Sequence, residues 1–92
     1  MDILEKKKKR LKIQSWRRGM KEMDLILGNF IDRYIFLLTR DELDCYEQLL
    51  QHDDQMIFTW IMNTHEAPRE FTFLLKKISD FAFSKSKVIP LT

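Results

Sequence analysis

Apolar residues recur at intervals of three and four along almost the whole 92-residue chain, and this spacing restricts the possible folds most strongly. The chain contains only two glycines and two prolines. No segment alternates apolar and polar residues with the period of two that a half-buried strand requires. We therefore predict an all-α fold, in which residues 1–92 form one single-domain five-helix bundle with short connections.

The first two predicted helices differ in character. Residues 2–15 are expected to form a basic N-terminal helix with few apolar contacts. The second helix is expected to be long and amphipathic, with Gly28 inside it at a cost of about 1 kcal/mol relative to alanine. Its apolar stripe comprises Met20, Met23, Leu27, Phe30, Ile31, Tyr34 and Leu38.

Local signals mark the starts of three further helices. Thr39 and Glu42 form the sequence pattern of a capping box before the third helix. Asp53 or Asp54 can cap a short fourth helix. Pro68 suits the first turn of a fifth helix, where its missing N–H does no harm. The buried faces are expected to include Leu43, Tyr46, Leu49, Leu50, Ile57, Trp60, Ile61, Phe71, Leu74, Leu75, Ile78, Phe81 and Ala82.

Composition limits the cellular context. A single cysteine excludes an internal disulfide, and no apolar run approaches the 18 or so residues of a membrane span. The N-terminus has no apolar secretory stretch, and Asp2 and Glu5 are unusual for a mitochondrial transit peptide. The expected location is the bacterial cytoplasm, with a processed mitochondrial matrix protein as the alternative. Residues 84–92 are expected to form a frayed tail.

Charge is distributed unevenly along the chain. Residues 1–21 contain nine Lys and Arg against two acids, a net charge of +7, whereas residues 22–92 contain seven against twelve, a net charge of −5. The basic first helix should therefore attract the rest of the domain. The basic run at residues 6–10 also leaves open a nucleic-acid-binding bundle as an alternative function. The run has no interleaved aromatic residues and the pI is about 8.8, so a solvated helical face is the preferred interpretation.

Residues suited to catalysis or metal binding are sparse. Cys45, His52 and His65 are the only thiol and imidazole groups, and no pair of them has the spacing of a metal site. The sequence has no G-x-S-x-G turn and no glycine-rich phosphate loop. We therefore expect no catalytic site, no metal and no enzyme activity.

The string RRGMKEMD, residues 17–24, breaks the helical rules that the rest of the chain follows. It places two arginines and a glycine at the expected start of the second helix, where the helix dipole disfavours cations. An ion pair between Arg18 and Glu22 would stabilise a helix by only about 0.3–0.5 kcal/mol. A docking surface explains these residue types better. Gly19 leaves a gap that another backbone can approach, Arg18 offers a planar fork of donors, and Glu22 accepts hydrogen bonds.

Arg18-Gly19-x-x-Glu22 resembles the signature of the small flavinylation factors of succinate dehydrogenase. A second segment, Asp53-Asp54-x-x-x-Phe58-x-Trp60-x-Met62-Asn63, is similar to another part of that family, and the resemblance spans residues 16–81. It implies a helical assembly chaperone. Such a factor binds the flavoprotein subunit of succinate dehydrogenase, and in some bacteria that of fumarate reductase, and promotes covalent attachment of FAD.

The resemblance also implies a division of roles. The partner carries FAD and the chemistry, so this chain is expected to bind no FAD stably and to be monomeric when free. Asp53 and Asp54 match the second family-like segment and either contact the partner or only cap a helix. The expected partner-binding residues are Arg17, Arg18, Gly19, Met20, Glu22, Asp24, Asp53 and Asp54.

Overall fold

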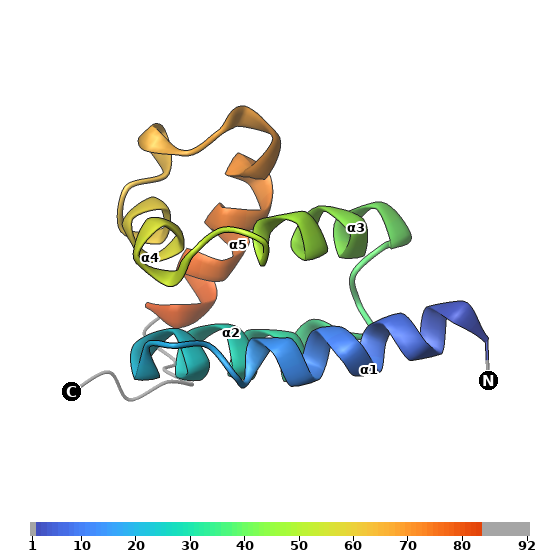
Figure 1. Ribbon diagram of the computed structural model, residues 1–92. Coiled ribbons are helices and arrows are strands. Elements are labelled where there is room, and N and C mark those ends of the chain that lie inside the picture. The colour runs from blue at the N-terminus through green and yellow to red at the C-terminus, as the bar shows by residue number, and fades with distance from the viewer. Residues whose placement is uncertain (1, 84–92) are drawn as a thin grey trace.

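The computed structural model describes residues 2–83 and contains the five predicted α-helices (Figure 1). They are α1 (Ile3–Ser15), α2 (Lys21–Tyr34), α3 (Arg40–Leu49), α4 (Asp54–Met62) and α5 (Thr72–Ala82), with short 3-10 turns η1 (Thr64–Glu66) and η2 (Arg69–Phe71) between α4 and α5. No residue from 2 to 83 lies in a β-strand. The all-α prediction is therefore confirmed, and the predicted tail at 84–92 lies outside the described residues.

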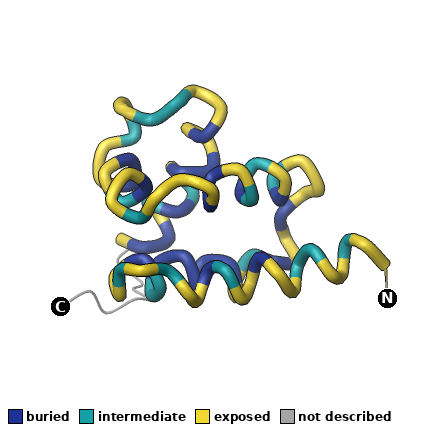
Figure 2. The backbone as a smooth tube through the Cα atoms, viewed as in Figure 1, coloured by how far each residue is buried: buried dark blue, intermediate teal, exposed yellow. Residues whose placement is uncertain are grey.

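The helices form two layers. In Figure 1, α1 and α2 run antiparallel along one side of the molecule, and α3, α4 and α5 lie above them. α5 connects the layers because it packs on α2 as well as on α3 and α4. Figure 2 shows why α1 is the outermost helix: only Leu11 and Ser15 of α1 are buried, whereas six residues of α2 are.

Aromatic side chains fill the space between the layers. Phe30 of α2 lies 4.9 Å from Tyr34, 6.0 Å from Tyr46 and 5.8 Å from Phe81, measured between ring centroids. Tyr46 is fully buried, and its hydroxyl lies 2.6 Å from Ser15 Oγ. Burial raises the pKa of Tyr46, so the hydroxyl stays neutral and holds α3 against α1. Apolar burial of this kind is the main stabilising term for a domain of this size.

The predicted helix caps are present. Thr39 and Glu42 form a complete capping box at the start of α3, and Asp53 caps α4 by accepting a hydrogen bond from Met56 N at 2.8 Å. The hydrogen bond from the Thr39 backbone holds the pKa of Glu42 below its ordinary value. Each such cap stabilises the helix by about 1 kcal/mol.

Three predicted helix boundaries are wrong. α2 begins at Lys21, so Arg17, Arg18 and Gly19 lie in the link between α1 and α2, and Lys21 rather than the two arginines is the cation at the start of the helix. α2 ends at Tyr34, and the chain continues to Leu38 as a turn. Pro68 precedes η2 rather than opening α5 directly. The apolar spacing continues through both the link and the turn, which is why it overestimated the length of the helix.

Gly28 is explained by a close contact between α1 and α2. A Cβ atom at this position would lie 2.3 Å from the Trp16 ring, a separation that real Cβ atoms do not adopt. The Trp16 indole lies across the helix backbone there and donates from Nε1 to Asp32 at 3.1 Å. Gly28 therefore offsets its helix cost by letting an aromatic ring pack directly on α2.

The expected attraction between the basic first helix and the rest of the domain takes the form of ion pairs. Lys7 pairs with Asp44 and also lies 3.3 Å from Glu47 of α3. Arg10 pairs with Glu47, and Lys12 lies 3.7 Å from Asp32 of α2. The hydrogen bond from Arg10 lowers the pKa of Glu47. Part of the basic run thus holds α1 onto the fold.

Candidate functional site

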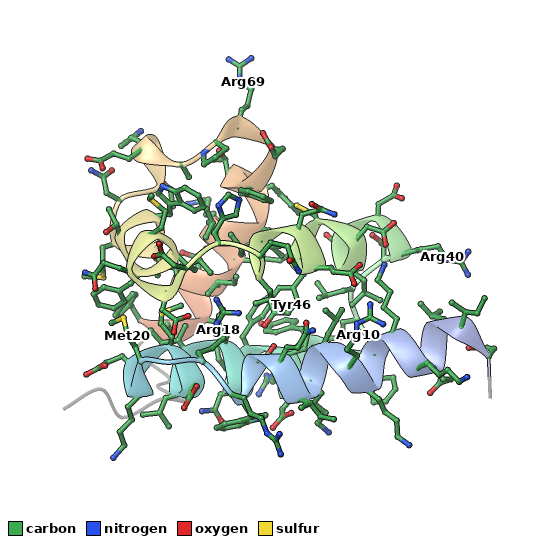
Figure 3. The ribbon with its side chains drawn as sticks, in the orientation of Figure 1. Arg10, Arg18, Met20, Arg40, Tyr46 and Arg69 are labelled. Atoms are coloured by element: carbon green, nitrogen blue, oxygen red, sulfur yellow. The ribbon has the colours of Figure 1, made fainter. Side chains whose placement is uncertain are left out.

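The link between α1 and α2 lies against the start of α4. In Figure 3, Arg18 points from this link toward the segment that joins α3 to α4, and Met20 lies at the end of α2 nearest to α4. These segments are more than 30 positions apart in the sequence. The contact depends on one guanidinium and one carboxylate.

Arg18 bonds to three acceptors from two helix ends. Its Nε donates to Asp54 Oδ1 at 2.6 Å, Nη1 to the Leu50 carbonyl at 2.9 Å, and Nη2 to the His52 carbonyl at 2.8 Å. Leu50 is the C-cap of α3, where backbone oxygens lack helical partners and a cation is favourable, whereas His52 lies in the segment between α3 and α4. The guanidinium therefore joins the end of α3 to the start of α4.

Asp54 completes the contact by binding the link. Its Oδ2 accepts from Gly19 N at 2.6 Å and from Met20 N at 3.0 Å. Burial disfavours the charged carboxylate, but hydrogen bonds from Arg18 and Met20, the charge of Arg18 and the bond from Gly19 outweigh it and lower the pKa of Asp54. Asp54 is therefore ionised at neutral pH.

We call this arrangement the Arg18 clasp. It consists of Arg18, Asp54, the backbone N–H groups of Gly19 and Met20, and the carbonyls of Leu50 and His52. The side chains of Arg18 and Asp54 are only 13% and 11% exposed, so the pair is largely screened from solvent. Removing one partner of such a pair leaves an uncompensated charge, which is strongly destabilising.

Arg18 and Asp54 have partners within the chain that the sequence did not predict, and their expected contact with another protein stays a prediction. Arg18 does not hold its fork open to solvent, because Nε, Nη1 and Nη2 all donate within the chain. Asp54 does not cap α4, because Asp53 does. The Arg18–Glu22 ion pair is also not formed within the described part of the chain, where Arg18 pairs with Asp54. This ion pair was the less favoured interpretation of the sequence, and the carboxylate that Arg18 does bind is 36 positions away.

Asp24 also acts within the chain. It lies in the first turn of α2, and its Oδ1 accepts a hydrogen bond from Arg18 N at 2.5 Å. The N-cap of α2, Met20, has no side chain that can accept such a bond. Asp24 and Asp54 thus order the link from its two sides, and the backbone N–H groups of residues 18–20 all have acceptors.

The outward surface of the link is formed by the remaining predicted residues. Arg17, Gly19 and Glu22 are exposed, and Met20 is half-buried. A Cβ atom at Gly19 would lie 3.4 Å from Asp54 Oδ2, an ordinary contact distance, so packing within the chain does not require glycine there. A small residue at this surface leaves room for another molecule to approach the ordered backbone.

The structure therefore brings together four of the eight predicted residues in one contact: Arg18, Gly19, Met20 and Asp54. Sequence reasoning missed the carbonyls of Leu50 and His52, since backbone acceptors carry no residue-type signal. It also missed Trp16, which lies two residues before Arg18 and packs on Gly28. The sequence signal that could have pointed to Trp16 is its position as an aromatic residue directly before the RRG string.

A hollow of about 320 Å³ lies beside the end of α3 and is lined in part by Cys45, His52, Glu70 and Phe71. The His52 ring lies edge-on to Trp60 at 5.0 Å and to Phe71 at 5.5 Å. Burial raises the pKa of the Cys45 thiol, whose Sγ donates to the Glu70 carbonyl at 3.3 Å. The thiol is therefore held protonated and is poorly suited to act as a nucleophile.

Among residues 2–83, no group of three or more His, Cys, Asp or Glu side chains is arranged to hold a metal ion. In the same part of the chain, no helix has the length and apolarity needed to cross a bilayer.

Comparisons with known proteins identify relatives over most of the chain. A family model described as "flavinator of succinate dehydrogenase" matches residues 9–82. The mitochondrial succinate dehydrogenase assembly factor 2 of Dictyostelium discoideum is 46% identical over 76 residues, covering 82% of this chain and 54% of that protein. The protein of the same name in Candida glabrata is 35% identical over 93 residues, covering 96% of this chain and 61% of its own length. The FAD assembly factor SdhE of Legionella pneumophila is 43% identical over 54 residues, covering 59% of this chain and 67% of that protein.

These comparisons correct the expected location. The relatives from D. discoideum, C. glabrata and Saccharomyces cerevisiae are named as mitochondrial proteins, so the expectation of a bacterial cytoplasmic protein is wrong. The acidic residues Asp2 and Glu5 were given too much weight as a sign against a mitochondrial protein. The chain spans only 54% and 61% of the length of the D. discoideum and C. glabrata relatives.

Proposed function

Because the chain belongs to the family of succinate dehydrogenase flavinators, we propose that it binds the flavoprotein subunit of succinate dehydrogenase and promotes covalent attachment of FAD to it. The observation that carries this proposal is the exposed surface at Gly19, ordered from beneath by the Arg18 clasp. It lies within the family match at residues 9–82. The comparisons give no support to the nucleic-acid-binding alternative.

The proposed role of the clasp is to position the docking surface. Hydrogen bonds from Gly19 N and Met20 N to Asp54 fix the link before any partner arrives. A preordered loop loses less conformational freedom on binding, which raises affinity without an additional contact. The flavoprotein backbone would approach over Gly19, while Arg17 and Glu22, both exposed, supply charge-assisted hydrogen bonds at its edges.

The proposed contribution to flavinylation is orientation of the partner, without a catalytic group from this chain. Binding that favours one conformation of the flavoprotein would hold its reacting side chain near the flavin and so raise the rate of bond formation. FAD then belongs to the partner throughout, and this chain alone would not bind it stably. Following the names of its relatives, we place this activity in the mitochondrion.

The test compares two substitutions at Gly19 during co-expression with the flavoprotein subunit. Gly19→Arg fills the space above the link, whereas the matched control Gly19→Ala adds one methyl group at an ordinary contact distance. Covalent flavin is read by in-gel fluorescence under denaturing conditions, and folding of both variants by circular dichroism. Gly19→Arg should lower covalent flavin by about tenfold or more, the equivalent of about 1.4 kcal/mol, with the control near wild type. A folded Gly19→Arg protein with full activity would remove Gly19 from the contact.

A parallel arm replaces the partner with the flavoprotein subunit of fumarate reductase. Equal stimulation of both partners would extend the proposal to fumarate reductase, and stimulation of succinate dehydrogenase alone would restrict it. Equilibrium dialysis of the isolated chain with FAD addresses the cofactor. Retention of FAD by this chain would contradict the proposed division of roles.

A further inference from the structure

The basic run of α1 is divided between two faces of the helix. Lys7 and Arg10 form ion pairs with α3, and Lys8 Nζ lies 5.1 Å from the centroid of the Phe36 ring. Lys6 and Lys9 are exposed and form no ion pair within residues 2–83. Lys7 and Arg10 thus hold α1 against α3, whereas ion pairs within the described residues do not explain the presence of Lys6 and Lys9.

The outward cations form one line with an exposed isoleucine. Lys6, Lys9 and Ile13 follow one another at intervals of three and four, which places them along one side of α1, and Arg17 follows in the link just after the C-cap Trp16. We call this line the outer stripe. With a rise of about 1.5 Å per residue, its helical part from Lys6 to Ile13 extends roughly 10 Å along α1.

Ile13 distinguishes the outer stripe from a surface that serves only solubility. Its side chain is 55% exposed between charged neighbours, where it contributes nothing to the core. A lone exposed isoleucine is common, but an apolar group surrounded by cations has the composition of an interface, in which charge surrounds a smaller apolar contact. Asp2 is occupied in capping α1, and Glu5 reduces the local positive charge without cancelling it.

The outer stripe is continuous with the candidate docking surface. It ends at Arg17, which is exposed and separated from Gly19 by Arg18 alone. A molecule seated over Gly19 and Glu22 would therefore meet Arg17, and the rest of the stripe leads away from that point along α1. The same partner can thus contact both surfaces.

We propose that the outer stripe is an electrostatic extension of the docking surface, which binds an acidic strip on the flavoprotein subunit next to the part that contacts Gly19. This inference depends on the proposed function. The partner's chemistry follows from the stripe: carboxylates opposite Lys6, Lys9 and Arg17, and an apolar group opposite Ile13. Exposed charges at the edge of an interface mainly speed association, so the stripe would act chiefly on the association rate.

The experiment measures association of the purified chain with the apo-flavoprotein subunit at several salt concentrations. Lys6→Gln/Lys9→Gln removes two charges from the stripe. The matched control Arg69→Gln/Lys76→Gln removes two exposed charges from the opposite layer, where Figure 3 shows Arg69 pointing away from α1. Circular dichroism and thermal melting establish that both variants fold.

The stripe variant should associate about three- to tenfold more slowly than wild type at low salt, and this difference should shrink toward about 0.5 M salt. The control should match wild type. Ile13→Ala should instead raise the dissociation rate. If the stripe variant behaves as the control does, while Gly19→Arg still abolishes binding, the stripe proposal fails and the proposed function stands.

Two other results would also overturn the inference. Stripe-dependent binding of RNA or DNA, with flavoprotein binding unchanged by Lys6→Gln/Lys9→Gln, would assign the stripe to nucleic acid. Failure of the wild-type chain to bind any succinate dehydrogenase flavoprotein would remove the proposed function, and the stripe proposal with it.

Discussion

The two glycines of this chain occupy contrasting environments. Gly28 lies inside α2, and a Cβ atom there would lie 2.3 Å from the Trp16 ring, so packing within the chain dictates its identity. Gly19 is exposed, and a Cβ atom there would lie at an ordinary 3.4 Å from Asp54 Oδ2. The contrast teaches that a glycine required by the fold can be separated from one that the fold merely permits. Where the fold does not require glycine, as at position 19, contact with another molecule is the better explanation for it.

The largest loss of stability is expected when Asp54, whose carboxylate binds the link at Gly19, is replaced. Asp54→Ala removes the carboxylate that binds Arg18, Gly19 and Met20, and it leaves the guanidinium largely buried without its counter-charge. The free energy of unfolding should fall by about 2–4 kcal/mol. Urea denaturation measures it, with Asp53→Ala as a control that removes only the α4 cap, worth about 1 kcal/mol. Equal losses from the two variants would show that the clasp adds nothing beyond capping.

The next effect tests the glycine that the fold requires. Gly28→Ala forces the Trp16 ring away from α2 and should lower the free energy of unfolding by about 1–3 kcal/mol. In the background Trp16→Ala the same change should become neutral or stabilising, because alanine then contributes its helix preference of about 1 kcal/mol. A double-mutant cycle by urea denaturation gives the coupling energy. Zero coupling would mean that Trp16 is not what excludes a side chain at position 28.

A smaller effect follows from the lowered pKa of Asp54. Its pKa is lower in the folded protein than the ordinary 3.8, so ionisation of Asp54 stabilises the fold above about pH 4 and this contribution is lost as the pH falls through the folded-state value. Asp54→Asn should therefore be less stable than wild type at pH 7, and the difference should narrow between about pH 4 and pH 2. Thermal melting across this range measures it. A constant difference at every pH would exclude titration of Asp54 as the cause.

The smallest effect on stability is expected at the glycine that the fold merely permits. Gly19→Ala should change the free energy of unfolding by less than about 0.5 kcal/mol, because the site is exposed and the new methyl group lies at an ordinary contact distance, 3.4 Å, from Asp54 Oδ2. Comparison with Gly28→Ala by the same urea denaturation sharpens the contrast directly. A loss at position 19 as large as that at position 28 would show that both glycines serve the fold.

The fold was predictable because its signals are local. Helical spacing, the Thr39 capping box and the Asp53 cap each lie within one or two turns of the chain, and the structure contains all of them. The ends of α2 were predicted wrongly, since Met20 and Leu38 continue the apolar spacing beyond the helix itself. Tertiary packing gives these residues buried or half-buried positions without helical backbone.

The sequence pointed to four residues of the Arg18 clasp but not to its backbone acceptors or its connections. Arg18, Gly19, Met20 and Asp54 were singled out as partner-binding residues, not as partners of one another. Spacing alone could not show that Arg18 bonds across the fold to Asp54, Leu50 and His52 rather than to nearby Glu22. Which acceptors Arg18 binds depends on where the end of α3 and the start of α4 lie in space. Every residue has a backbone carbonyl, so the sequence cannot indicate which carbonyls accept these hydrogen bonds.

The Arg18 clasp joins residues 18–20 to residues 50–54, so it closes only after α1 through α4 have taken their native places. The link at residues 18–20 therefore depends on α3 and α4 for its order, and damage to either helix would disorder the surface at Gly19. Under the proposed function, copies damaged in this way would present no ordered surface at Gly19 and would bind the partner weakly.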